Sequence, residues 1–195
     1  DEWSRAMRRD INHPSIVAWV PVNESWGVDP LNTTGPERIR AASLLKSLYH
    51  LTKSLDPTRL CIGNDGWQHA ETDIVTIHEY TQDADDLAQR YQAFEKDPYA
   101  NTFTHNRVIL LPELPRSRYE ELPVMITEFG GCKVASEGKE GWGYGEAVAD
   151  YDEMVDRIAS LVDAIKAQER VCGYCYTQLT DVQQEVNGLM TPDRR

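Results

Sequence analysis

Long apolar runs and long basic runs are both missing from this sequence of 195 residues. No apolar stretch approaches the roughly 20 residues that an α-helix needs to cross a bilayer. No basic run is longer than that of Arg8 and Arg9, and 32 acidic against 20 basic side chains give a formal net charge of −12. Because nucleic acids and anionic lipids attract basic patches, we expect neither as a partner, and a neutral substrate fits the charge better.

Cysteine is also scarce, with four residues spread over the chain. So few scattered thiols do not indicate a disulfide framework, which favours a reducing, cytoplasmic compartment. Cys172 and Cys175 match the C-x-x-C spacing, but they lie in the strand-like run VCGYCYTQL. Residues three apart on a strand point to opposite faces and cannot jointly hold one metal ion. We therefore expect two small, buried, apolar side chains there.

Short apolar strands alternate with longer amphipathic helices along the chain, which is typical of an α/β protein with parallel strands. Residues 99–122 are polar and contain prolines, so an extended surface loop is expected there. Strands are predicted within residues 15–22, 60–65, 73–80, 123–131 and 171–179, and helices up to residue 13 and within 35–57, 83–98 and 145–169.

Two architectures fit five such strands: an open doubly wound sheet, or an arc of a (β/α)8 TIM barrel. No glycine-rich phosphate loop follows any strand, although a nucleotide-binding sheet would carry one. Polar residues instead follow several different strands, which is how a barrel assembles its active site. We therefore predict a barrel. Because a complete barrel has eight strands and typically about 250 residues, this chain is expected to form a partial one.

Glu24 and Glu128 each end a predicted strand. Strand alternation places each carboxylate on the face of the apolar residues at even numbers before it, namely Ala18, Val20 and Val22 for one and Val124 and Ile126 for the other. A buried carboxyl group without a partner is costly, so proteins retain one mainly where it is paired or used. A lone glutamate at a strand end could be a solvated or salt-bridged rim residue, but two facing one pocket suit glycoside hydrolysis.

Four segments, taken together and in this order, carry a further signal: NHPSIVAWVPVNESWG, NDGWQHAETDIVTIHEY, PVMITEFGG and YTQLTDVQQEVNGLMTPDR. They resemble the retaining glycosidases whose carboxylates follow barrel strands four and seven, and in particular glycoside hydrolase family 2. The resemblance implies that Glu24 is the acid/base, Glu128 the nucleophile, Asn23 the residue that binds the sugar 2-hydroxyl and Tyr80 a hydrogen-bond donor to the nucleophile.

The same resemblance implies that residues 1–195 correspond to barrel strands four to eight, the C-terminal portion of a catalytic domain. The first three strands and the β-sandwich domains that precede them in the family would then lie outside this chain. The implied activity is a retaining exo-β-glycosidase acting on β-galactosides or β-glucuronides. A cellulase-like or β-mannanase-like enzyme and a non-catalytic carbohydrate-binding fragment remain as alternatives.

Five further residues are candidates for contact with the sugar. His78 shares a predicted strand face with Tyr80, where it could contact substrate or carboxylate or be a core histidine. Asp65 and Trp67 follow a strand in a glycine-containing loop, and Trp67 could stack on a sugar or pack at the rim. Trp142 lies in a glycine-rich loop after the Glu128 strand, and Gln178 ends the last strand.

No cofactor is expected, and no metal, because His78 and Glu79 form no HExxH motif and no second histidine lies at ligand spacing. The expected partner is a carbohydrate substrate. An incomplete barrel also has exposed strand edges, and exposed edges pair readily with another chain. We therefore expect self-association, or a homo-oligomer, through the barrel edges.

Overall fold

The computed structural model describes residues 1–26, 28, 35–100, 102–103, 107–135 and 141–195. Residues 104–106 of the predicted surface loop and residues 136–140 of the predicted glycine-rich loop lie outside the described residues. The five predicted strands and four predicted helices are present in the predicted order. Strict alternation fails twice, because the strands Leu60–Cys61 and Val75–Glu79 are consecutive and an additional short helix, Arg116–Tyr119, precedes the fourth strand. No described helix is both long enough and apolar enough to span a membrane.

The helices begin and end where the sequence indicates. α2 has Pro36 in its first turn and ends before Asp56 and Pro57, because proline disfavours a helical conformation of the residue before it. The side chain of Asp83 caps α3 by accepting a hydrogen bond from the Asp86 amide at 2.8 Å. The bounds are α1 Glu2–Asp10, α2 Pro36–Leu55, α3 Ala84–Lys96, α4 Arg116–Tyr119 and α5 Tyr151–Lys166.

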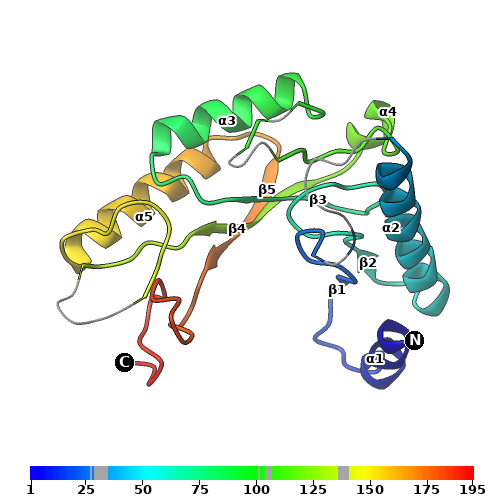
Figure 1. The fold of residues 1–195 in the computed structure, drawn as a ribbon, viewed down its shortest axis with the longest axis horizontal. Helices are drawn as coiled ribbons and strands as arrows, with labels where there is room; N and C mark the ends of the chain where they lie inside the picture. Colours follow the sequence, from blue (N-terminus) through cyan, green and yellow to red (C-terminus); the bar gives the residue numbers. More distant parts are fainter. Residues whose placement is uncertain (27, 29–34, 101, 104–106, 136–140) are drawn as a thin grey trace.

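All paired strands run parallel and form two small sheets, β1-β2 and β3-β4-β5. Together they trace an arc with α2, α3 and α5 along its outer side, and the inner side is open (Figure 1). This is the predicted arrangement of a partial (β/α)8 barrel. The strands are β1 Ala18–Trp19, β2 Leu60–Cys61, β3 Val75–Glu79, β4 Val124–Gly130 and β5 Val171–Thr177.

The main apolar core lies between the three-stranded sheet and the helices outside it. Val75 and Ile77 of β3 and Val124 and Ile126 of β4 belong to one buried cluster. The same cluster includes Leu87, Tyr91 and Phe94 of α3 and Leu161 and Ile165 of α5. The outer faces of β3 and β4 therefore carry the packing, which leaves their inner faces for polar side chains.

Glu128 lies on the inner side, as predicted, but the prediction that it shares a face with Val124 and Ile126 is wrong. Val124 and Ile126 pack against the outer helices, so strict alternation would have turned Glu128 outward as well. The pairing of β3 with β4 instead changes register, since Ile77 opposes Ile126 and His78 opposes Glu128. Thr127 is the extra residue of this bulge, and one extra residue reverses the side to which later side chains point.

The prediction that Glu24 shares a face with Val20 and Val22 is also wrong, because alternation fails before it. Trp19 and Val22 are both buried, at 6% and 9% exposure, although residues three apart on a regular strand face opposite sides. Val20, between them, is 37% exposed. Pro21 has no amide hydrogen to donate to a neighbouring strand, so β1 ends after two residues.

The prediction of an extended surface loop over residues 99–122 is wrong for the described part. Ile109, Leu110 and Leu114 are fully buried, and residues 116–119 form α4. The amide of His69 donates to the Ile109 carbonyl at 2.8 Å, and the Leu111 amide donates to the His69 carbonyl at 3.0 Å. These apolar side chains pack at the end of the sheet because their burial is favourable, although the segment as a whole has the polar, proline-containing composition of a loop.

Cys172 and Cys175 are exposed, which contradicts the prediction of buried thiols. Both belong to β5, which among the described strands pairs only with β4, and whose register with β4 shifts twice. Because β5 has a neighbouring strand on one side only, few of its side chains are covered by the rest of the described chain. The two thiols therefore lie on the surface of the described chain.

We propose that residues 1–195 self-associate through the two ends of the arc. Among the described strands, β1 and β5 each pair with a single neighbour. Exposed apolar side chains accompany these edges, with Val17 directly before β1 at 78% and Tyr174 of β5 at 45% exposure. Unpaired strand edges beside apolar side chains favour pairing with another copy.

Residues 1–195 expressed alone are expected to elute as a dimer or larger species in size-exclusion chromatography with light scattering. Tyr174→Lys should shift the population toward monomer, because a lysine on an edge strand opposes pairing. The matched control is Val155→Lys, which adds the same charge at a residue of α5 that is 64% exposed. A monodisperse monomer from the unmodified chain would contradict the proposal.

Candidate active site

A left-handed turn follows β1 and presents Glu24. Glu24 and Ser25 have φ angles of 55° and 56°, a conformation that residues other than glycine adopt rarely. Buried hydrogen bonds hold the turn: the Ser25 amide donates to Asn64 Oδ1 at 3.0 Å, and the Ser25 hydroxyl donates to Gln68 Oε1 at 2.6 Å. The Glu24 amide donates to the carbonyl of Asp65 at 2.8 Å. Strain of this kind persists only where the surroundings fix it.

Both carboxylate oxygens of Glu24 have a partner. The indole Nε1 of Trp26 donates to Oε2 at 3.0 Å. The imidazole Nδ1 of His78 lies 2.8 Å from Oε1. The Glu24 side chain is 16% exposed, so it is held in place yet still accessible.

Glu128 is fixed from the neighbouring strand. The Tyr80 hydroxyl donates to Glu128 Oε2, and His78 Nδ1 lies 3.3 Å from the same oxygen. The ring of Tyr80 stacks on that of Tyr144, with 3.7 Å between centroids and 7° between planes. The predicted contact between Tyr80 and the carboxylate of Glu128 is therefore present in the geometry.

His78 lies among three carboxylates, and its side chain is fully buried. Besides Glu24 and Glu128, its Nε2 lies 3.5 Å from Asp65 Oδ1, an oxygen that also accepts a hydrogen bond from Thr127 at 2.6 Å. Burial alone would lower the pKa of His78, but the interactions with Asp65 and Glu24 and the charge of Glu128 raise it to about 9. His78 is therefore a cation at neutral pH that contacts carboxylates, and not a neutral core histidine.

Gly66 allows His78 to occupy this place. Its φ angle is +96°, and a Cβ there would lie 2.5 Å from Cγ and Nδ1 of the imidazole. The ring packs directly over the glycine backbone, while Trp67 meets the ring edge-on with centroids 5.9 Å apart. Only a residue without a side chain fits under the imidazole.

The spacing of the two glutamates is short enough for both to touch one sugar. One oxygen of Glu24, one of Glu128 and a ring nitrogen of His78 all lie within 4.8 Å of one another. Three such ligand atoms could also surround a metal ion. A protonated His78 already supplies positive charge at that point, so the carboxylates have a partner without a metal.

The pKa shifts follow from burial in this crowded, acidic environment. Burial raises the pKa of Glu128, and the neighbouring Glu24 and Asp65 add to that, while His78 and the Tyr80 hydroxyl oppose it. Burial and the charge of Glu128 also raise the pKa of Tyr80, which keeps its hydroxyl protonated as a donor. The pKa of Asp65 is lowered because its interactions with His78 and Thr127 outweigh burial.

A cavity of about 530 Å³ opens beside this cluster. Glu24, His78 and Tyr80 form part of its wall, together with Trp26, Trp67, Arg107 and Tyr144. A volume of this size is within the usual range for small-molecule sites, which are roughly 300–1,000 Å³. Glu128 is not among the lining residues, but it contacts Tyr80 and His78, which are, so the cavity and the two glutamates belong to one candidate site.

Not every predicted sugar contact reaches the cavity. Trp67 lines it but is 3% exposed, with the guanidinium of Arg107 over its ring. Trp142 is 44% exposed and packs edge-on against Tyr144 with centroids 5.5 Å apart. Gln178 donates through Nε2 to Asn187 Oδ1 at 2.9 Å, which ties the strand end to the C-terminal segment. Asn23, by contrast, is exposed directly beside Glu24.

Some residues of the site were not predicted. Tyr144 follows Trp142 in the same glycine-rich loop and lines the cavity, whereas Trp142 is not among the lining residues, so the aromatic content of that loop was the available signal. Ser25 and Gln68 carried no signal, since their role is to hold the turn at Glu24. Arg107 also carried none, because it lies outside every predicted strand end.

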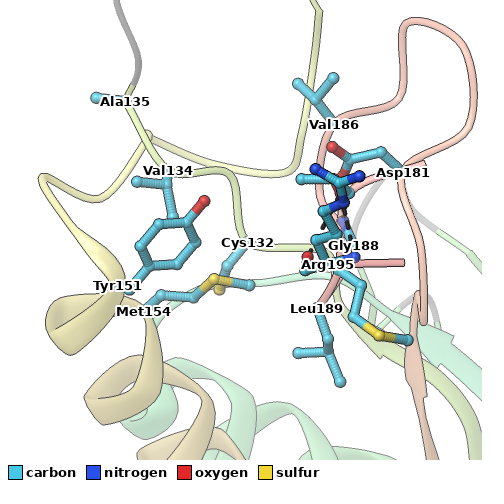
Figure 2. A pocket seen from close by; sticks show the side chains of 12 residues that line it. Cys132, Val134, Ala135, Tyr151, Met154, Asp181, Val186, Gly188, Leu189 and Arg195 are labelled. Atoms are coloured by element: carbon cyan, nitrogen blue, oxygen red, sulfur yellow. Dashed lines mark hydrogen bonds between the residues drawn. The ribbon is translucent and has the colours of Figure 1, made fainter. Parts of the chain in front are cut away.

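A second cavity, of about 390 Å³, lies between α5 and the C-terminal segment. Figure 2 shows Tyr151 and Met154 on one side of it and Val186, Leu189 and Arg195 on the other. None of the sequence-predicted site residues is among those that line it. This cavity is therefore separate from the candidate active site.

Parallel strands in an arc, helices outside them and a carboxylate pair at the strand ends define the class of (β/α)8-barrel glycoside hydrolases. The chain belongs to glycosyl hydrolases family 2, because the model of the family's TIM barrel domain matches residues 1–194. A comparison with curated protein sequences finds no match.

Solved structures share the fold at low sequence identity. Faecalibacterium prausnitzii β-glucuronidase is 22% identical with a TM-score of 0.63, over 99% of this chain and 31% of that one. Eisenbergiella tayi GH2 β-galacturonidase, bound to galacturonate, is 18% identical with a TM-score of 0.66, over 99% and 33%. Bifidobacterium dentium β-glucuronidase is 21% identical with a TM-score of 0.66, over 97% and 30%. The chain thus spans about a third of the length of these proteins.

The ion pairs of His78 are expected to make stability depend on pH. A histidine whose pKa is about 9 when folded and roughly 6.5 when unfolded contributes stability that is complete below pH 6.5 and lost as the pH rises through 9. Urea unfolding of the native polypeptide that contains residues 1–195 should therefore give a falling free energy over this window. His78→Gln should remove that component, whereas His50→Gln, at an exposed residue of α2, should keep it. Equal slopes for all three proteins would contradict the prediction.

Gly66→Ala is expected to destabilise the protein by about 2 kcal/mol or more, because the new methyl group must displace the imidazole and the backbone is left-handed. Gly35→Ala is a matched control, since Gly35 also has a positive φ, of +68°, but nothing lies within 4 Å of an added Cβ. Urea unfolding should give a smaller loss for the control, about 1 kcal/mol. Equal losses in the free energy of unfolding would mean that the clash with His78 does not contribute to the destabilisation.

Proposed function

We propose that the protein is a retaining exo-β-glycosidase that hydrolyses terminal β-linked sugars of the galactoside or glucuronide type. The observation that carries the proposal is the carboxylate pair, Glu24 and Glu128, with one oxygen of each within 4.8 Å of the other. Retaining glycosidases hold their two carboxyl groups about 5–5.5 Å apart, whereas inverting ones need a gap of about 6.5–9.5 Å for a water molecule. Membership of family 2 supports the reaction class.

In the first step, a carboxylate oxygen of Glu128 bonds to the anomeric carbon while the bond from that carbon to the leaving oxygen breaks. Glu24 gives its proton to the leaving oxygen, so the aglycone departs as a neutral alcohol. Tyr80 keeps the attacking oxygen in place through its hydrogen bond. We assign to Asn23, which is exposed beside Glu24, the hydrogen bond to the sugar 2-hydroxyl that the family resemblance implies.

In the second step, water replaces Glu128 at the anomeric carbon, and Glu24 removes a proton from that water. The two substitutions together retain the configuration of the sugar. His78 Nδ1 lies 2.8 Å from Glu24, so one proton can be shared along this hydrogen bond. His78 thus acts as a positioning residue, which holds both glutamates and balances their charges.

A 2-deoxy-2-fluoro glycoside with a good leaving group, added to the native polypeptide that contains residues 1–195, is expected to label Glu128. Glu24→Gln should lower kcat/KM on nitrophenyl glycosides about 100- to 10,000-fold, the usual weight of a general acid/base. Glu128→Gln should abolish turnover and labelling. Glu120→Gln is the matched control, at an exposed residue beside α4.

Three results would overturn the proposal. A label on a residue other than Glu128 would contradict the assignment of Glu128 as the nucleophile. A first product of inverted configuration, observed by NMR, would contradict a mechanism through a covalent intermediate. Saturable sugar binding without hydrolysis of any glycoside in a broad chromogenic panel would favour the carbohydrate-binding alternative.

A further inference from the structure

Two arginines line the candidate active-site cavity, and their surroundings differ. Arg90 of α3 is neutralised, because its Nε donates to Asp86 Oδ2 at 2.9 Å and its Nη1 to the Thr102 carbonyl at 3.4 Å. Arg107 has no carboxylate partner among the described residues. Its Nη1 is buried there without any hydrogen-bond acceptor.

Trp67 fixes the position of Arg107. The guanidinium carbon lies 3.3 Å from the centroid of the indole ring, a cation–π contact. Trp67 is itself buried and touches His78 edge-on. The guanidinium is therefore held close to the catalytic cluster on a rigid aromatic support, which limits the entropy lost when it binds a ligand.

Arg107 is partly buried and has no ion pair among the described residues, in a chain with 32 acidic residues. Other partly buried arginines have acceptors: Arg38 and Arg59 lie 2.6 Å from Glu113 and Asp56, and Arg170 donates through Nη2 to two backbone carbonyls at 3.1 and 3.2 Å. Removing a charged donor from water without giving it an acceptor is costly. Such a donor is retained in a cavity when the ligand supplies the missing acceptor.

We propose that Arg107 binds the carboxylate of a uronic acid, so that the preferred substrates are β-linked uronides and not neutral sugars. The planar fork of a guanidinium matches a carboxylate in two parallel hydrogen bonds. The site is acidic, with Glu24, Asp65 and Glu128 around His78, so an anionic sugar there requires a nearby cation. This inference rests on the proposed glycosidase function, and it replaces the expectation of a neutral substrate, which came from the net charge of the whole chain.

The test compares nitrophenyl β-galacturonide with nitrophenyl β-galactoside, two substrates that differ only at C6, on the native polypeptide that contains residues 1–195. The kcat/KM of the wild type should favour the uronide at least tenfold. Arg107→Gln should lower the ratio of the two kcat/KM values at least tenfold, because the uronide alone loses an ion pair. Arg107→Lys should keep part of the ratio, since it keeps the charge but not the fork.

Arg90→Gln is the matched control, because it removes a cation from the same cavity that is already paired, and it should leave the ratio unchanged. A wild type that prefers the galactoside would overturn the proposal. So would an Arg107→Gln variant that loses activity on both substrates equally, which would make Arg107 a support for Trp67. Circular dichroism and thermal unfolding identify any variant that fails to fold, and Arg107→Lys then decides.

Binding of the free sugars separates this proposal from the proposed function. Calorimetry with galacturonate and glucuronate, against galactose and glucose, needs no turnover. Tighter binding of the acids that Arg107→Gln abolishes would support the role of Arg107 even if no glycoside were hydrolysed. Equal binding of acids and neutral sugars would overturn it even if hydrolysis were observed.

Discussion

The ion pairs of His78 are the interaction on which the rest of the site depends. Three carboxylates, from Glu24, Asp65 and Glu128, approach one buried imidazole. Without a positive charge between them, carboxylates at this spacing would repel one another, and at least one would be neutralised by a proton. The imidazolium offsets this repulsion, so the three carboxyl groups can lie close together. The residues around the imidazolium fit this arrangement. Gly66 lies under the ring, Trp67 meets the edge of the ring, and Tyr80 donates a hydrogen bond to Glu128.

The two glutamates reach this imidazole by local departures from regular strand geometry. A register shift between β3 and β4 turns Glu128 inward, and a left-handed turn after β1 presents Glu24. The sequence predicted the strands, the helices, the two glutamates and the contact of Tyr80 with Glu128, because hydrophobic periodicity and motif order carry that information. The sequence did not predict how these side chains reach the site. A two-residue hydrophobic period reveals neither a β-bulge nor a left-handed turn at residues other than glycine.

Other features that the sequence did not predict depend on distant contacts. The composition of residues 99–122 predicts a surface loop, yet Ile109 to Leu111 pack at the end of the sheet against His69. The glycine-rich loop suggests Trp142 as a sugar contact, while the aromatic residue of this loop that stacks on Tyr80 is Tyr144. In both cases the type of residue was informative, but its burial was decided by strands and side chains far away in the sequence.

The net charge of the chain does not determine which ligand charge the site accepts. A net charge of −12 describes the average field over the surface, which affects solubility and long-range encounter. Recognition inside a cavity depends on the few groups that touch the ligand, because a low dielectric strengthens near charges relative to distant ones. His78 pairs through Nδ1 with Glu24 and Glu128, whereas Arg107 has no carboxylate partner among the described residues and its Nη1 has no acceptor there. The proposed reaction of the two glutamates and the proposed recognition of an anionic sugar are therefore compatible in one acidic protein, because separate cations serve them.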